Sequence, residues 1–366
     1  MNIVYSFNKK GYEARYWESE IRAASDARFT FIPFNHDPYL DTTKYARAQL
    51  LDNLYCQRHG ALMALYEDFE NVLRESHADA VIVDNCPPYH PDYLRRIDVY
   101  KVLRIADGPI SAYDRDFAYL HAYDHILYHS PAYSRDMGMA EKLRYCGARN
   151  IDFWPLALFD ACRDTTKTME TLFEHERDID IIFIGTQHLN KLPLLAEIKR
   201  AFGRRFKLFG LTSAKKNVYF NLRYKAGAWV RSVPFEKYVP LYQRAKIGIN
   251  IHNRGKYTVG SYRLFELPGN GVMQISDGGE YLSDFFENDT EIVGYETADE
   301  LIDKLHYYLE HDEERQAIAL RGYQRVMRSH RLAERMREAA EIIDAAMGRT
   351  GRGRATVQER RDSRKP

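Results

Sequence analysis

One segment of the sequence places a guanidinium and a carboxylate about one helical turn apart. The segment spans residues 262–277 and is predicted to contain a helix start, a glycine-containing turn and a buried strand. Arg263 and Glu266 are three residues apart, so a helix presents them on one face. A carboxylate there can accept hydrogen bonds from both ribose hydroxyls of a nucleotide, and a guanidinium can neutralise a diphosphate. The same spacing also fits an ordinary surface salt bridge.

A second segment combines a glycine, a hydroxyl and a lysine after a predicted strand. Residues 179–184 are followed by Gly185 and Thr186, then by Lys191 and a predicted helix with Pro193 in its first turn. Ligands of open parallel sheets bind beyond the carboxyl ends of the strands, where helix N-termini present N–H donors to phosphate. Gly185 would give clearance for a diphosphate, Thr186 a hydroxyl and Lys191 a positive charge. An ordinary strand-to-helix turn with an exposed lysine is the alternative.

The elements that would position these residues form two series of strands. Short β-branched or aromatic runs alternate with amphipathic helical stretches, a pattern typical of β-α units and parallel sheets. Strands are predicted at residues 2–7, 29–34, 80–84, 101–105, 125–128 and 151–154, and again at 179–184, 206–208, 247–251, 272–276 and 291–295. Helices are predicted at residues 50–74 and 298–310, and across 312–347.

The division between the two series predicts two domains. A polar, charge-rich interval at residues 162–178 separates them, and 366 residues exceed what one hydrophobic core usually organises. We expect an N-terminal domain at residues 1–160 and a C-terminal, nucleotide-binding domain at 161–347 that ends in long helices. Residues 348–366 have almost no apolar side chains, so they are predicted to form a basic, disordered tail.

Composition excludes several classes of function. The net charge is only +1, although residues 349–366 carry seven Lys or Arg against two acidic residues. The body is therefore slightly acidic, which argues against a nucleic-acid-binding protein. No apolar run approaches the length of a transmembrane helix and no signal-peptide pattern is present, so a cytoplasmic location is expected. The four cysteines lack the spacing of a zinc or redox site.

Several short matches together resemble one family. They include residues 237–250, the run Arg263-Leu264-Phe265-Glu266 with Gly271 after it, and pieces between residues 299 and 331. Over residues 178–332 the chain resembles the C-terminal domain of CgeB-like, spore-maturation-type glycosyltransferases. The resemblance implies the α/β GT-B architecture. In that fold, two Rossmann-like domains with parallel sheets face across a cleft, and C-terminal helices pack across both.

The resemblance also implies an activity and a set of residues. It implies transfer of a hexose-type unit from a nucleoside diphosphate sugar to an unknown acceptor hydroxyl. Arg263 would stabilise the charge of the leaving group, and Asp107, before Gly108-Pro109, would face the acceptor as a general base, although an Asp there is also an ordinary turn residue. The residues expected to bind the donor are Gly185, Thr186, Lys191, His252, Asn253, Tyr257, Thr258, Tyr262, Arg263, Glu266 and Gly271.

One departure and two rival functions remain open at this stage. Related retaining enzymes carry two glutamates seven residues apart; Glu266 matches the second, but the first position holds Thr258, so the stereochemical outcome stays open. No Asp-x-Asp pair follows a strand, so catalysis without a metal or other cofactor is expected. The rivals are a sugar-nucleotide epimerase of the same fold and a non-catalytic protein that binds sugar nucleotides or glycans. A separate alternative gives the basic tail a nucleic-acid or membrane-surface role.

Overall fold

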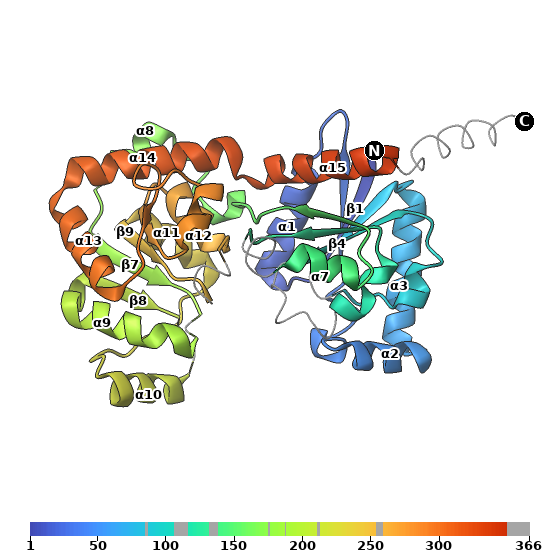
Figure 1. Ribbon diagram of the computed structural model, residues 1–366, viewed down its shortest axis with the longest axis horizontal. Coiled ribbons are helices and arrows are strands. Elements are labelled where there is room, and N and C mark those ends of the chain that lie inside the picture. Colours follow the sequence, from blue (N-terminus) through green and yellow to red (C-terminus); the bar gives the residue numbers. More distant parts are fainter. Residues whose placement is uncertain are drawn as a thin grey trace, which may run out of the picture. The chain divides into compact units, whose positions relative to one another are not determined.

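Two parallel β-sheets organise the chain in the computed structural model (Figure 1). The structure describes residues 1–84, 87–105, 116–131, 138–174, 176–186, 188–210, 213–253 and 259–349. One unit contains Met1–Leu156 together with the C-terminal helix α15 (Leu332–Arg349), and the other is Ala157–Arg331. Each unit has its own sheet and core, as expected of separate α/β domains.

The sheet of the first unit has the strand order β2-β1-β3-β4-β5-β6, with every pair parallel. Strands β3 and β4 are buried at every position, because a parallel sheet is covered on both faces. The strands are β1 (Asn2–Phe7), β2 (Thr30–Asn35), β3 (Ala80–Val83), β4 (Tyr100–Ile105), β5 (His125–Tyr128) and β6 (Asn150–Phe153). Its helices include α1 (Gly11–Ala23), α2 (Ala48–Cys56), α3 (Gly60–Glu75), α4 (Pro91–Leu94) and α7 (Met139–Tyr145).

The sheet of the second unit has the order β12-β11-β9-β7-β8 and is also parallel. Its strands are β7 (Ile179–Ile184), β8 (Phe206–Phe209), β9 (Ala245–Asn250), β11 (Met273–Ser276) and β12 (Val293–Gly294). Its helices include α8 (Met169–Phe173), α9 (Leu192–Phe202), α10 (Ala214–Tyr224), α11 (Tyr238–Gln243), α12 (Tyr262–Gly269), α13 (Ala298–Glu310) and α14 (Asp312–Ser329). Because β7, β9 and β11 are neighbours, their carboxyl ends meet at one edge of the sheet.

Every predicted strand is confirmed, with each end within two residues of its predicted position, but two predicted helices are each divided. Residues 50–74 form α2 and α3, separated by a turn in which Arg58 has a φ of 51° and the N–H of His59 donates to the carbonyl of Leu54 at 2.9 Å. Residues 312–347 form α14 and α15, which are separated at His330 and Arg331. A local hydrophobic pattern continues through both breaks, so it does not reveal them.

Helix α15 groups with the first unit, whereas the sequence placed residues 332–347 in the second domain. The indole N–H of Trp154 donates to the carbonyl of Arg335 at 2.6 Å, and α15 packs against α1. The chain therefore passes between the units twice, after Leu156 and again after Arg331. No helix in the described part of the chain is long and apolar enough to cross a bilayer.

Candidate functional site

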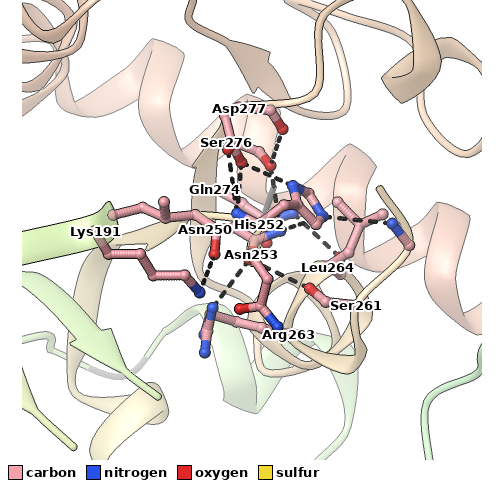
Figure 2. Close-up of polar contacts among 12 residues, drawn as sticks. Lys191, Asn250, His252, Asn253, Ser261, Arg263, Leu264, Gln274, Ser276 and Asp277 are labelled. Carbon is pink, nitrogen blue, oxygen red and sulfur yellow. Dashed lines mark hydrogen bonds and ion pairs between the residues drawn. The ribbon is translucent and has the colours of Figure 1, made fainter. Parts of the chain in front are cut away.

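The polar residues of the second unit converge at the carboxyl edge of its sheet (Figure 2). Gly185 follows β7, His252 follows β9 and Asp277 follows β11. Two helices also begin at this edge: α9, preceded by Lys191, and α12, which has Arg263 in its first turn. Such an edge is where α/β proteins bind ligands, because strand ends and helix N-termini leave backbone N–H groups available.

The guanidinium of Arg263 is fixed by contacts with β7 and β9. Its Nε donates to the carbonyl of Ile184 at 2.7 Å, and its Nη1 donates to Oδ1 of Asn250 at 3.1 Å. The group also lies over the ring of Phe183, 4.6 Å from the centroid. Arg263 and Glu266, both described, form no ion pair with each other, so the surface salt bridge allowed by their spacing is absent. A guanidinium held in this way is oriented before any ligand arrives.

Gly185 is required by the position of Arg263. A Cβ atom at Gly185 would lie 1.8 Å from Nη2 of Arg263, which is far inside van der Waals contact. Thr186, the next residue, is exposed and places its hydroxyl at the same strand end. The sequence predicted clearance at Gly185 for a diphosphate, whereas the group that approaches Gly185 in the structure is the side chain of Arg263.

Lys191 is buried next to Arg263, contrary to the alternative of an exposed lysine. Its side chain is almost fully enclosed, with 3% of the residue exposed, and Nζ donates to the carbonyl of Ile251 at 2.7 Å. Burial and then the charge of Arg263 lower the pKa of Lys191 to about 7. Figure 2 shows the two cationic groups approaching the same region. Among the described residues neither forms an ion pair with a carboxylate, so the pair favours an anionic ligand.

His252 has both ring nitrogens occupied. Its Nδ1 lies 2.7 Å from Oδ1 of Asp277, and its backbone N–H donates to the same carboxylate at 2.9 Å. Its Nε2 receives the N–H of Gly260 at 3.4 Å and the amide of Asn250 at 3.3 Å. Because Nε2 accepts from Gly260, the contact with Asp277 is assigned to an N–H at Nδ1. His252 therefore connects the residues after β9 to Asp277 and to Gly260.

Asn250 connects this network and was missed by the sequence analysis. Its Oδ1 accepts from Arg263 and from the hydroxyl of Ser261 at 3.4 Å, while its Nδ2 donates to Oγ of Ser276 at 3.2 Å. The residue is fully buried at the end of β9. An asparagine at the end of an otherwise apolar strand is the only sequence signal for this role, because a buried amide requires partners.

The other predicted site residues are distributed over four parts of the chain. Tyr262 and Glu266 lie on α12 with Arg263, and Asn253 lies after β9, where its carbonyl accepts from Asn190 at 2.6 Å. Gly271 lies elsewhere, before β11 at the opposite edge of the sheet, where a Cβ would meet Nη2 of Arg177 at 2.8 Å. Its φ of 68° and this contact explain the glycine, so Gly271 is not part of the site. Asp107, Tyr257 and Thr258 lie outside the described residues.

No metal-ligand cluster accompanies this network. Within the described part of the chain, no group of three His, Cys, Asp or Glu side chains is arranged to hold a metal ion. Asp277 is close enough for its charge to act on Lys191, and it is hydrogen-bonded to His252. The groups present are those that bind an oxyanion: a fixed guanidinium, a buried ammonium and a glycine at a strand end.

Comparison with solved structures identifies the architecture. Sucrose-phosphate synthase from Thermosynechococcus elongatus is 12% identical with a TM-score of 0.57, and the match covers 94% of this chain and 99% of that one. A glycosyltransferase from Rickettsia africae is 12% identical with a TM-score of 0.58, covering 94% and 98%. The chain has the GT-B fold. Anabaena HepE, solved in complex with UDP-glucose, matches this GT-B chain at 11% identity with a TM-score of 0.57, covering 94% and 100%.

The segment that matches a known sequence family includes most of the candidate site. Residues 187–341 match the sequence model of a family described as glycosyl transferase-like. This segment contains Lys191, Asn250, His252 and Arg263. No curated protein sequence matches the chain. The family match is to a broader group than the CgeB-like family that the sequence resembles, so it does not test the CgeB-like resemblance.

Proposed function

We propose that the protein is a glycosyltransferase that binds a nucleoside diphosphate sugar in its second unit and transfers the sugar to an acceptor hydroxyl. One observation carries the proposal: Lys191 and Arg263 lie together at the carboxyl edge of the sheet, and the described residues supply no ion-pairing carboxylate to either. A diphosphate provides the negative charge that such a pair favours. The GT-B fold and the match of residues 187–341 to a glycosyl transferase-like family support this proposal.

The chemistry requires charge stabilisation on the leaving group. Breaking the bond between the anomeric carbon and the phosphate oxygen leaves both bonding electrons, and hence a negative charge, on the nucleoside diphosphate. Arg263 is already oriented by Ile184 and Asn250, so it needs little reorganisation to stabilise this charge. Lys191, with a pKa near 7, becomes fully protonated when a diphosphate binds beside it.

Glu266 is proposed to bind the ribose of the nucleotide. It lies one turn after Arg263 on α12, close enough to Tyr242 for its charge to raise the pKa of that buried phenol, after the larger effect of burial. A carboxylate one helical turn from a diphosphate site can accept hydrogen bonds from the two ribose hydroxyls. Thr186, Asn253 and Tyr262 are proposed to complete the donor contacts, with Tyr257 and Thr258 from the adjoining segment.

Four finer points also remain proposals. The residues present favour a mechanism without a metal ion, in which cations of the protein neutralise the diphosphate. Asp107 is proposed as the general base for the acceptor, because a carboxylate can accept the hydroxyl proton. A uridine nucleotide and a hexose are the first donor to test, since HepE of the same fold was solved with UDP-glucose. The CgeB-like subfamily is proposed from the sequence resemblance.

The experiment measures release of nucleoside diphosphate from uridine, guanosine, thymidine and adenosine diphosphate sugars, with EDTA present and water as the acceptor. We expect release from one nucleotide series, and a loss on the order of ten- to a hundredfold in Arg263→Ala, as charged hydrogen bonds of this kind warrant. Asp107→Asn should lose turnover while it keeps donor affinity. Formation of a second sugar nucleotide without diphosphate release would identify an epimerase, and donor binding with no turnover would identify a binding protein; either result contradicts the proposal.

A further inference from the structure

Helix α10 exposes an apolar face that the unit does not use for its own core. Leu222 follows Val218 by four residues and Tyr219 by three, so the three side chains share one face of the helix, and they are 47%, 43% and 78% exposed in the order Val218, Tyr219, Leu222. The opposite face carries the fully buried Phe220, which anchors α10 to the unit beside α9 (Figure 1). The outward apolar face therefore makes no contribution to the core of the unit.

The chain after α10 adds an exposed tryptophan, held by backbone contacts. The side chain of Asn217 accepts from the N–H of Val230 at 2.7 Å and donates to its carbonyl at 2.9 Å. Asn221 makes the same pair of contacts with Ala228, at 3.0 and 2.8 Å. Trp229 lies between these two clamped residues and is 61% exposed. These four hydrogen bonds fix the backbone on both sides of Trp229, so its exposed position is determined by the structure of the loop.

The segment that contains this apolar face is rich in basic residues. Residues 198–235 contain ten Lys or Arg and no Asp or Glu. In the described part of the chain, Arg205 is the only one of these ten that forms an ion pair, with Asp180. Lys215 and Arg223 lie at the two ends of the α10 face and are exposed, as are Lys225 and Arg231 in the following loop. The α10 surface therefore joins aliphatic and indole side chains to a local positive charge in a protein whose net charge is +1.

We propose that the α10 surface, defined by Lys215, Val218, Tyr219, Leu222, Arg223 and Trp229, binds an anionic lipid bilayer. Lys and Arg attract the negatively charged headgroups, while leucine, valine and tryptophan enter the boundary between headgroups and acyl chains. Exposed aliphatic side chains favour a bilayer over a nucleic acid, because bases stack on aromatic rings and gain little from Leu222 or Val218. This mode of attachment lies on the surface and requires no spanning helix.

Trp229 provides a direct probe of this contact. The chain contains three tryptophans, and Trp17 and Trp154 are each only 2% exposed. Trp229 is therefore the one whose environment a bilayer can change. With phosphatidylcholine vesicles that contain phosphatidylglycerol, we expect a blue shift of the emission and quenching by brominated acyl chains. Both signals should disappear in Trp229→Phe, and vesicles of phosphatidylcholine alone should give neither.

Vesicle flotation tests the face itself. Leu222→Glu should lower the partition coefficient by roughly tenfold, since it removes one inserted side chain and adds a like charge to the lipid. Tyr145→Glu, at a site 95% exposed in the other unit, is the matched control and should bind as the wild type does. Raising the ionic strength should weaken binding, because the attraction to headgroups is screened. Unchanged melting temperature and nucleotide affinity would show that Leu222→Glu is folded.

Several outcomes would overturn the proposal. Equal flotation of Leu222→Glu and the wild type would exclude the α10 surface. Loss of flotation on deletion of residues 350–366, with Leu222→Glu still bound, would assign the contact to the tail. Binding of single-stranded oligonucleotides in place of vesicles, or a self-association that Leu222→Glu abolishes while vesicles are ignored, would identify a different partner.

Discussion

At the scale of single residues, Lys191 gives the site its dependence on pH. Its pKa of about 7 arises from burial and from the neighbouring charge of Arg263. Without ligand, the ammonium therefore loses its proton as the pH rises through 7. A bound diphosphate favours the protonated form and raises the pKa again. Ligand binding and proton binding are consequently linked at this residue.

The first prediction is proton uptake on binding. Above pH 7, nucleoside diphosphate binding should take up close to one proton through Lys191, and the affinity should fall as the pH rises from 6 to 9. Calorimetry in buffers of different ionisation enthalpy measures the uptake directly. Lys191→Met keeps the volume of the side chain and should abolish the uptake. An uptake that persists in the variant would assign the proton to another group.

The second prediction concerns the stability of the fold, which should change with pH in the opposite direction to the nucleotide affinity. The unfolded chain keeps Lys191 protonated up to its ordinary pKa of 10.5, whereas the folded chain releases the proton near 7. Between these values the unfolded state binds more protons, so the contribution of Lys191 to the free energy of unfolding rises with pH. Urea unfolding of the wild type and of Lys191→Met at pH 6.5 and pH 9 measures the contribution of Lys191 to the free energy of unfolding. A difference between the two proteins that does not change with pH would contradict a lowered pKa.

At the scale of elements, the ends of β7 and β8 show why two glycines are needed next to each other. A Cβ at Gly185 would meet the guanidinium of Arg263, which is the end of a flexible side chain. A Cβ at Gly210, after β8, would lie 1.9 Å from the carbonyl oxygen of Gly185, which is backbone, and Gly210 has a φ of 118°. The first glycine therefore makes room for Arg263, and the second allows the ends of β7 and β8 to lie close together.

The third prediction separates these two roles. Gly185→Ala should displace Arg263 and weaken nucleotide binding by about tenfold, with a smaller effect on stability. Gly210→Ala should lower the free energy of unfolding by about 2–3 kcal/mol, because the backbone itself must move. Denaturant unfolding and nucleotide titration of both variants provide the comparison. Equal effects of the two substitutions on both quantities would disprove the assignment.

The sequence predicted the elements of this edge better than their contacts. Strand β7 and the start of α12 follow from hydrophobic runs and turn residues, which are local signals. The burial of Lys191 and the role of Asn250 depend on three strands that meet only after folding, so no local pattern contains them. The packing of α15 with the first unit likewise depends on a contact between Trp154 and Arg335, which are 181 residues apart in the chain.

At the scale of the whole molecule, the second unit closes on itself. The N–H of Leu158, near its start, donates to the carbonyl of His330, near its end, at 2.7 Å. Asp160 accepts from the guanidinium of Arg331 at 2.8 Å. The two ends of the unit are thus joined, as is common in domains that fold independently. All the described residues of the proposed donor site belong to this unit.

The fourth prediction follows from this closure. Residues 157–331 expressed alone should fold cooperatively and bind nucleoside diphosphate with an affinity within about threefold of the full chain, because no donor contact is lost. Circular dichroism with thermal unfolding, followed by titration, tests both statements. Folding without binding would show that the first unit contributes to the donor site.

The central claim is that Arg263 and Lys191 together hold a diphosphate, and calorimetric titration with nucleoside diphosphates tests it most directly. We expect one nucleoside diphosphate to bind the wild type, and Arg263→Lys, which keeps the charge but cannot make both contacts with Ile184 and Asn250, to bind on the order of tenfold more weakly. Lys191→Met should weaken binding by a similar factor at pH 6 and by less at pH 9. Equal affinities of the wild type and both variants, or no binding of any nucleoside diphosphate, would contradict the account.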